Sequence, residues 1–337
     1  MAAEIREQPT RVRAAFDGAR TQLPALAALL GDARSVVFLG RGSSRSASSF
    51  GALALQRIAG VPARLGSPAE LGWGPSEGAL DGSLVVAVSQ SGESTEMVAA
   101  AEAVLRAGRA MIVVTNTADS TMAGLVPPER LLLCHAGLEQ AVPATKSFTT
   151  SLACLLSIAL STDSSGFERA VVGIPSAMEE MLALDPAPPL PPEVGGLILV
   201  GEGYASAVAE EGAIKFREVL KMLVASLEAS DFLHGSITSA QPAVGVVTIA
   251  ADGIGTGLAT KVLVEAQSRG ATTFGIGPEP LSADHAGVVP AMPAAWVPFA
   301  AIVWLQQMAL ATGLGRGLDP DRPPGLSKIT RIGAVGD

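Results

Sequence analysis

Short apolar runs rich in β-branched residues alternate, along the first half of the chain, with longer segments in which apolar residues recur at helical spacing. Three such runs, at 35–39, 83–88 and 110–114, predict buried strands. The segments 43–59 and 95–107 predict helices. Strands that alternate with helices of this length indicate parallel βαβ units.

The Pro-rich segment 185–193 interrupts this alternation, which then starts again. The second half predicts, in order, a strand at 196–200, a helix at 205–223, a strand at 244–249, a helix at 257–268 and a strand at 271–276. We therefore expect an α/β fold of two tandem domains with central parallel sheets. The expected division is a first domain over 1–184, a linker over 185–193, a second domain over 194–315 and a tail over 316–337.

The restart has the register of an internal repeat. An offset of 161 positions relates Gly40 to Gly201, Gly42 to Gly203, Glu70 to Asp231, Trp73 to His234 and Gly92 to Gly253. The same offset carries residues 85–88 of the second strand onto 246–249. Two similar α/β domains explain this register better than a coincidence between βαβ units. The halves differ in their polar residues, which predicts binding in the first half and acid–base chemistry in the second.

Composition narrows the class of protein. Of the 337 residues, 48% are hydrophobic and 16% are charged, so the chain must fold around buried cores. A net charge of −9 and an aromatic content of 4% exclude a general nucleic-acid binder. Its apolar runs fall short of the ~20 residues that a membrane span needs, and the charged N-terminus has no signal-peptide core. Two cysteines make neither a disulfide framework nor a zinc site. We expect a cytoplasmic protein without a membrane partner.

The segment 89–95 (SQSGEST) lies between a predicted strand and a predicted helix. Ligands of parallel α/β sheets bind beyond the carboxyl ends of the strands, and the N–H groups at a helix start attract anions. Ser89, Gln90, Ser91 and Ser94 therefore suit a phosphate that is bound without lysine, as in a sugar monophosphate. The alternative is ordinary capping of a helix by Ser and Thr.

The segment 40–45 (GRGSSR) starts like a dinucleotide-binding loop, but position 45 is Arg and the third glycine is missing. We therefore expect no nicotinamide cofactor. Gly42, Ser43 and Ser44 instead offer hydroxyls and amides to a polar ligand. Arg41 either balances phosphate charge or is solvated.

Three residues of the second half share one face of a predicted helix. Glu211, Lys215 and Glu218 are spaced i, i+4 and i+7. By themselves they are typical of a surface ladder of ion pairs. His234 lies in a loop and suits proton transfer near neutral pH, whereas His135 and His285 receive no role. In the irregular tail, Lys328 lies between apolar residues. A partly desolvated lysine there could attack a carbonyl group. The alternative is that Lys328 only neutralises phosphate or closes the site as a lid.

Taken together, these motifs resemble the tandem sugar-isomerase (SIS) family, which includes the isomerase half of glucosamine-6-phosphate synthase and stand-alone SIS-type glucosamine-6-phosphate deaminases. The residues that carry the resemblance are Glu4, Ile5, Glu7, Gln8, Pro9, the loop 42–44, the loop 89–94, Glu139, Val142, Thr145, Lys146, Phe148, Thr149, the helix motif 211–218, His234, Gly235 and 326–328. The resemblance implies two flavodoxin-like α/β/α sandwich domains, a phosphosugar site, no cofactor, no metal and a homodimer.

The resemblance also implies roles for single residues. Ser43, Ser89, Gln90, Ser91 and Ser94 match phosphosugar ligands, and Val142 matches a backbone contact. Glu218 matches the base that moves a proton between C1 and C2, and Lys215 matches a helper near the C1 oxygen. His234 matches the ring-opening group, contributed across the dimer interface. Lys328 matches a tail lysine that can form a Schiff base with the keto sugar.

The sequence departs from the synthases in several places. Ala144 replaces a sugar-binding serine, Ser236 replaces a proline, and Arg41 replaces a cysteine. Because no glutaminase domain precedes Met1, we do not expect glutamine-fed amination. The expected activity is conversion of an amino-hexose 6-phosphate, such as glucosamine 6-phosphate, into a ketose phosphate and ammonia. The alternatives are isomerisation without deamination, a fructosamine-6-phosphate deglycase, and a non-catalytic phosphosugar sensor.

Overall fold

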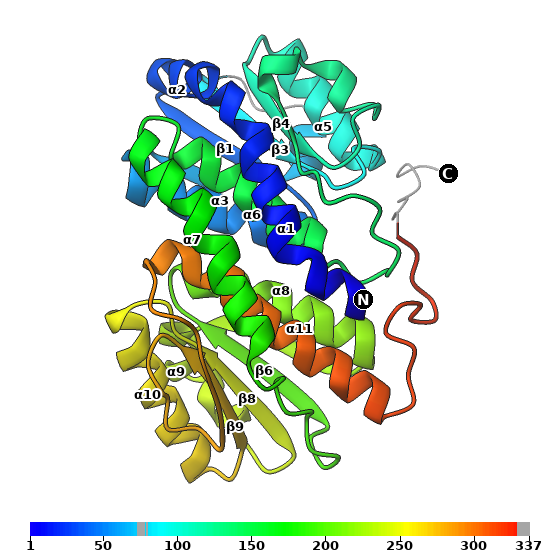
Figure 1. Cartoon of the computed structure of the whole chain (residues 1–337), viewed down its shortest axis with the longest axis vertical. Helices are drawn as coiled ribbons and strands as arrows, with labels where there is room; N and C mark the ends of the chain where they lie inside the picture. Colours follow the sequence, from blue (N-terminus) through cyan, green and yellow to red (C-terminus); the bar gives the residue numbers. More distant parts are fainter. Residues whose placement is uncertain (73–77, 79, 329–337) are drawn as a thin grey trace. The chain divides into compact units, whose positions relative to one another are not determined.

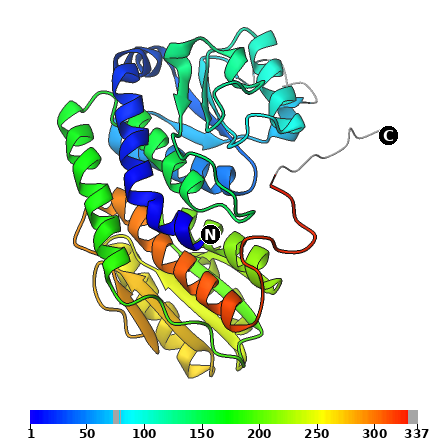
Figure 2. The same cartoon turned by 45° about the vertical axis from the view of Figure 1, so that its right-hand side comes forward.

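A computed structural model describes residues 1–72, 78 and 80–328 (Figures 1 and 2). The chain forms two compact units, each discontinuous in sequence. The first-sheet unit comprises residues 10–139, 146–172 and 327–337, and the second-sheet unit comprises residues 1–9, 140–145 and 173–326. This division differs from the linear one expected from the sequence. Residues 185–193 lie within the second-sheet unit and do not separate the two.

The first-sheet unit is built on a parallel sheet of five strands in the order β2-β1-β3-β4-β5. The strands are β1 (Ser35–Leu39), β2 (Ala63–Leu65), β3 (Ser83–Val88), β4 (Met111–Thr115) and β5 (Leu131–Leu133). Its helices are α2 (Leu23–Asp32), α3 (Ser43–Ala54), a π-helical turn (Leu55–Ala59), α4 (Pro68–Gly72), α5 (Thr95–Arg106) and α6 (Lys146–Ala159). Two further helices, α1 (Ala2–Ala19) and α7 (Ser164–Ala183), contribute residues to both units.

The second-sheet unit also has a parallel five-stranded sheet, in the order β10-β9-β8-β6-β7. Its strands are β6 (Gly196–Gly201), β7 (Leu223–Glu228), β8 (Val244–Ile249), β9 (Thr272–Gly277) and β10 (His285–Val288). Its helices are α8 (Tyr204–Leu220), α9 (Ala229–Leu233), α10 (Gly253–Ser268) and α11 (Val297–Gly315). Figures 1 and 2 both show α8 and α11 side by side on one face of this sheet.

The two sheets share one topology. Read from its β7 edge, the second sheet has the strand order of the first sheet read from β2. The loops after the first strand of each sheet also share a conformation. Gly42 has φ 53° and ψ −130°, and Gly203 has φ 60° and ψ −124°. A Cβ at Gly40 would lie 2.5 Å from the carbonyl oxygen of Ser44, which explains why this position needs glycine. The register seen in the sequence is therefore a structural repeat.

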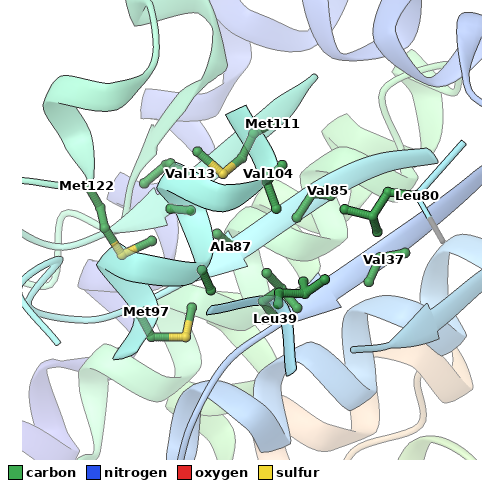
Figure 3. Close-up of a cluster of buried hydrophobic side chains, with 13 residues drawn as sticks. Val37, Leu39, Leu80, Val85, Ala87, Met97, Val104, Met111, Val113 and Met122 are labelled. Carbon is green, nitrogen blue, oxygen red and sulfur yellow. The ribbon is translucent and has the colours of Figure 1, made fainter. Parts of the chain in front are cut away.

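The core of the first-sheet unit lies between the sheet and α5. Figure 3 shows side chains of β1, β3 and β4 meeting Met97 and Val104 of α5. Val85, Ala87 and Val113 are fully buried. Because parallel strands are covered by helices on both faces, their side chains are apolar in both directions, and the sequence has continuous rather than alternating apolar runs.

The strands expected at 35–39, 83–88 and 244–249 are confirmed residue for residue. Four edge strands, β2, β5, β7 and β10, were not expected. β2 and β5 have only three residues each, and β7 and β10 contain mostly residues that are partly or fully exposed. The helix expected at 205–223 is wrong at its end. It stops at Leu220 because Lys221 adopts the left-handed conformation, and β7 begins two residues later.

One helical stretch, Ala294–Gly315, is long and apolar enough to cross a membrane by length and composition. In the fold, 72% of its apolar window is buried inside the protein, as in the core helix of a globular domain. The Pro-rich segment before β6 has neither helix nor strand but is not a free linker. The N–H of Leu190 donates to Thr312 Oγ1 of α11 at 2.9 Å, and Leu190 is buried.

Candidate functional site

In the first sheet, β1 and β3 are hydrogen-bonded neighbours whose chain connections leave in opposite directions, to β2 and to β4. A crevice beyond the carboxyl ends of such a strand pair is where ligands of open α/β sheets bind. The loop after β1 carries Gly42, Ser43 and Ser44, and the loop after β3 carries the segment 89–94. We call the place where the chain connections reverse direction the switch point of the sheet. The structure thus brings the two polar loops that the sequence analysis singled out to the switch point of the first sheet.

The loop after β3 is held in shape by its own backbone. Gly92 has φ +65°, and its N–H donates to the Ser89 hydroxyl at 3.2 Å. Glu93 is not directed at a ligand, because its carboxylate accepts from the N–H and the hydroxyl of Thr121 at 2.7 and 2.8 Å. Ser94 is the N-cap residue of α5, yet its side chain makes no capping hydrogen bond. A tight turn at Gly92 therefore shapes this loop.

The loop after β1 supplies hydroxyls rather than a positive charge. Ser43 and Ser44 are half-buried at the start of α3. Arg41 is engaged by Glu96 of α5, with Nε 2.9 Å from a carboxylate oxygen. This hydrogen bond raises the pKa of Arg41. The guanidinium therefore joins the loop after β1 to the first turn of α5, and its charge is paired with that of Glu96.

A third group lies at the same edge of the first sheet. Asn116, just after β4, donates its N–H to the Gln90 carbonyl at 3.1 Å. Its side-chain amide bonds the backbone of Ala136 and Gly137, each at 2.9 Å, beyond the end of β5. Two residues further on is Glu139, whose buried carboxylate accepts from Lys328 Nζ at 2.6 Å.

Glu139 is held by the start of α6 as well as by the tail lysine. Its carboxylate accepts the Ser147 N–H at 3.1 Å and the Ser147 hydroxyl at 2.6 Å. Burial alone would raise the pKa of Glu139. The Lys328 ammonium and the Ser147 donors outweigh it, so that the pKa lies below its ordinary value. The tail lysine thus occupies a defined position in the first-sheet unit.

The three charged residues on α8 of the second-sheet unit form a buried cluster. Lys215 Nζ lies 2.6 Å from Glu218 Oε2 and 3.4 Å from Glu211 Oε1. The side chains of Glu211 and Lys215 have no solvent exposure, whereas Glu218 keeps 26%. The interpretation of these three residues as a surface ladder of ion pairs is therefore wrong. Burying such ion pairs costs desolvation free energy. Of the three charged side chains, Glu218 is the one that reaches solvent.

The remaining expected residues lie in the second-sheet unit. His234 follows α9 and is exposed. The Val142 N–H donates to the Asp321 carbonyl at 2.9 Å, so any ligand contact there would use the Val142 carbonyl. Trp73, the repeat counterpart of His234, lies outside the described residues.

The switch point of the second sheet is built differently. Asp252, the counterpart of Ser91, caps α10 and accepts the Gly255 N–H at 2.7 Å. Glu202, the counterpart of Arg41, accepts the N–H and hydroxyl of Ser230 at 3.1 and 3.3 Å. Two carboxylates therefore stand where the first sheet has a hydroxyl and a guanidinium. An external anion would be repelled there.

The expected site residues divide between the units. The first-sheet unit holds Gly42, Ser43, Ser44, Ser89, Gln90, Ser91, Ser94 and Lys328, and the second-sheet unit holds Lys215, Glu218, His234 and Val142. Asn116, Ser147 and the role of Glu139 as a partner of Lys328 were not expected from the sequence. An Asn that directly follows a strand, at the sheet edge where ligands bind, is the signal that could have pointed to Asn116.

The two histidines without an expected role have structural surroundings. His285 stacks on Phe274 with ring centroids 4.9 Å apart. The His135 ring packs against Gly18, where a Cβ would lie 2.4 Å from Nε2. Among the residues that the structure describes, no group of three His, Cys, Asp or Glu side chains is placed to hold a metal ion.

Comparison with known proteins now adds to this geometry. Residues 29–161, which contain the first sheet and both polar loops, match the model of the SIS domain. The chain carries a SIS domain. A glutamine–fructose-6-phosphate aminotransferase of Pyrococcus horikoshii is 28% identical over 98% of this chain and 57% of its own length. The chain spans less than two thirds of the curated relatives that it matches over nearly its whole length.

Solved structures show the same fold as this chain. The C-terminal domain of glucosamine-fructose-6-phosphate aminotransferase from Francisella tularensis has a TM-score of 0.82 at 19% identity, covering 95% of this chain and 97% of its own. Glucosamine-6-phosphate deaminase from Thermotoga maritima has a TM-score of 0.76 at 20% identity, covering 98% of this chain and 99% of its own. Both chains are covered almost completely, so the likeness extends to both sheets.

Proposed function

We propose that this protein is a phosphosugar isomerase that releases ammonia from an amino-hexose 6-phosphate, converting glucosamine 6-phosphate or a close analogue into fructose 6-phosphate or its analogue. The proposal includes a second, divergent SIS domain around the second sheet, and a cytoplasmic homodimer. Relatives named glutamine–fructose-6-phosphate aminotransferase and a structural neighbour named glucosamine-6-phosphate deaminase support the substrate class.

One observation carries the proposal: the loops after β1 and β6 share a backbone conformation at Gly42 and Gly203, yet the polar groups at the two switch points differ in charge. The first presents the hydroxyls of Ser43, Ser44 and Ser91 around a turn at Gly92. The second has its α10 N-terminus occupied by the chain's own carboxylate at Asp252. Hydroxyls and helix-start amides bind phosphate, so the phosphate of the sugar belongs at the first switch point.

Proton transfer is assigned to the second-sheet unit. Lys215 engages Oε2 of Glu218, which leaves Oε1 for the substrate. His234 of the second copy would open the pyranose ring, and Glu218 would then take the proton from C2 and return it at C1. The amino aldehyde thereby becomes a C2 imine with a C1 hydroxymethyl group. A positioned acid–base pair of this kind contributes ~10²–10⁴-fold to the rate.

Lys328 is assigned to the release of ammonia. The ammonium group of Lys328 would first release a proton to water, and the neutral amine would then attack C2 of the imine. A C–N bond forms while the two amine protons pass to the substrate nitrogen, which leaves as ammonia. Water then hydrolyses the resulting lysine Schiff base, which returns the amine and gives the C2 carbonyl of the ketose phosphate. The net reaction takes up one water and releases one ammonia. The contact of Lys328 with Glu139, in the unit that carries the serine loop, supports this role.

The test combines turnover with binding. Purified protein is incubated with glucosamine 6-phosphate, while ammonia and fructose 6-phosphate are measured by separate coupled assays. We expect equal amounts of the two products. Ser91→Ala should raise KM by at least about tenfold, since it removes a hydrogen bond to a charged group. Ser268→Ala on α10 is the matched control and should leave KM unchanged.

Other outcomes would identify the alternatives. Ketose phosphate formed from an aldose phosphate without ammonia indicates a plain isomerase. Release of an amine from a fructosamine 6-phosphate indicates a deglycase. A thermal shift with sugar phosphates and no turnover of any of them indicates a sensor. Absence of both turnover and thermal shift contradicts the phosphosugar site itself.

A further inference from the structure

We propose that Glu139, held by Ser147 at the start of α6, is the positioning residue that seats the tail lysine Lys328 at the phosphosugar edge of the first sheet. We call Glu139 and Ser147 together the seat of Lys328. The contacts of the seat do not depend on the proposed function. The importance of the seat for turnover rests on the function proposed above.

The geometry of the seat is that of a fixed receptor for an ammonium group. Glu139 Oε1 accepts the Ser147 N–H at 3.1 Å, and Oε2 accepts both the Ser147 hydroxyl and Lys328 Nζ at 2.6 Å. The Glu139 side chain is fully buried, whereas Lys328 retains 26% exposure. The carboxylate is thus oriented by a rigid helix end, and the flexible partner is the lysine.

Burial makes this pair different from the surface pairs of the same unit. Arg106 and Glu102, for example, lie 3.5 Å apart with 67% and 47% exposure, and such pairs contribute little. A carboxylate that is already desolvated, and already fixed by two donors, holds an ammonium group more strongly because little side-chain freedom is lost on pairing. The tail therefore has a preferred docking point.

The seat is connected to the ligand loop by hydrogen bonds. Asn116 accepts from the Ala136 N–H, donates to the Gly137 carbonyl, and donates its backbone N–H to the Gln90 carbonyl. Glu139 follows Gly137 by two residues. The hydrogen bonds of Asn116 therefore connect the loop 89–94 with the segment that carries Glu139. Through Glu139 they also fix the position of the Lys328 amine, which an irregular tail alone would not fix.

Glu139 is suited to positioning rather than to proton transfer. Its pKa lies below the ordinary value despite burial, chiefly because the Lys328 ammonium is its partner. A carboxylate of that kind is a weak base. We therefore expect substitutions at Glu139 to act through the placement of Lys328.

Competitive acylation of lysines tests the seat without any substrate. The chain has five lysines, at 146, 215, 221, 261 and 328. Folded protein is treated with a limiting amount of acetic anhydride at pH 8, and peptide mass spectrometry gives the rate at each lysine. Exposed Lys221 is the internal reference. Lys328 should react about tenfold more slowly than Lys221, because its charge-assisted hydrogen bond must break first.

Three variants test whether pairing with Glu139 causes the slow acylation of Lys328. Glu139→Gln keeps the size and a hydrogen-bonding group but removes the charge, and should bring the Lys328 rate close to that of Lys221. Ser147→Ala loosens the carboxylate and should raise the Lys328 rate by a smaller factor. Glu129→Gln, at an exposed glutamate of the same unit, is the control and should change nothing. If Glu139→Gln gives no folded protein, Ser147→Ala decides.

Two results would contradict the proposed role of Glu139 in holding Lys328. One is acylation of wild-type Lys328 as fast as that of Lys221, and the other is an unchanged Lys328 rate in Glu139→Gln, or in Ser147→Ala if Glu139→Gln does not fold. Its role in turnover is measured separately: Glu139→Gln should lower kcat by at least about tenfold while KM stays within about twofold, since the serine loop is intact. A fall in kcat matched by an equal loss of folded protein would argue for a structural role alone. If the wild type turns over no sugar phosphate, the proposed function fails, but the acylation result still decides the seat.

Discussion

Replacing Gly92 by alanine would disturb the loop after β3 in two ways that can be measured apart. Gly92 has φ +65°, a conformation that costs an L-residue about 1–2 kcal/mol. The new methyl group would also lie 2.1 Å from the Ser120 hydroxyl oxygen and 2.5 Å from Ser120 Cβ. Ser120 is buried, so it cannot swing into solvent. Relief of such a clash costs about 1–3 kcal/mol. The total loss of unfolding free energy should be about 2–5 kcal/mol.

Gly108→Ala is the matched control. Gly108 lies in the same unit, follows α5 and has φ +69°, but a Cβ there would meet nothing within 4 Å. It should lose only the conformational part, about 1–2 kcal/mol. Urea unfolding followed by circular dichroism would give both values, and the difference of about 1–3 kcal/mol measures the contact with Ser120. Adding Ser120→Gly to Gly92→Ala should recover most of that difference.

Equal destabilisation by Gly92→Ala and Gly108→Ala would refute the steric part of this reasoning. Failure of Ser120→Gly to recover stability would show that another neighbour is responsible. The two variants should also differ in ligand binding. Gly92→Ala should weaken the thermal shift given by sugar phosphate, whereas Gly108→Ala should bind as the wild type does once its lower stability is allowed for.

Three further predictions concern other parts of the chain. Glu218→Gln should abolish exchange of the substrate's C1 and C2 hydrogens with D₂O, observed by NMR, because the amide cannot accept the proton; exchange at the wild-type rate would remove Glu218 from the mechanism. The Glu139–Lys328 pair should stabilise the fold fully at pH values above 4.5, the ordinary pKa of a glutamate. This stabilisation should be lost as the pH falls from 4.5 through the lower pKa that Glu139 has in the folded protein. A difference in unfolding free energy between wild type and Glu139→Gln that stays constant from pH 7 to pH 3 would contradict this prediction. Cys134 and Cys154 are both buried, so neither thiol should react with Ellman's reagent until the protein is unfolded; rapid reaction in the native state would show that the segment opens.

Local features of the sequence determined much of the architecture. The strands β1, β3 and β8 follow from continuous apolar runs, because a strand covered on both faces can contain few polar side chains. The glycine pairs after β1 and β6 carry the repeat, because the conformation at Gly42 and Gly203 is one that few other residues adopt. The serine loops could be placed at a sheet edge for the same reason: chain direction in a βαβ unit decides at which end of the strand a loop lies.

Only the tertiary structure decided which charged groups are buried and with whom they pair. The spacing of Glu211, Lys215 and Glu218 predicts one helix face, but whether that face meets solvent depends on what packs against α8. Lys328 and Glu139 are 189 positions apart, and no local pattern relates them. Edge strands such as β2 were missed because their short, half-exposed residues are held by a neighbouring strand rather than by their own periodicity. Periodicity is a property of adjacent residues, whereas burial and pairing are properties of the whole packed chain, and the candidate site depends on both.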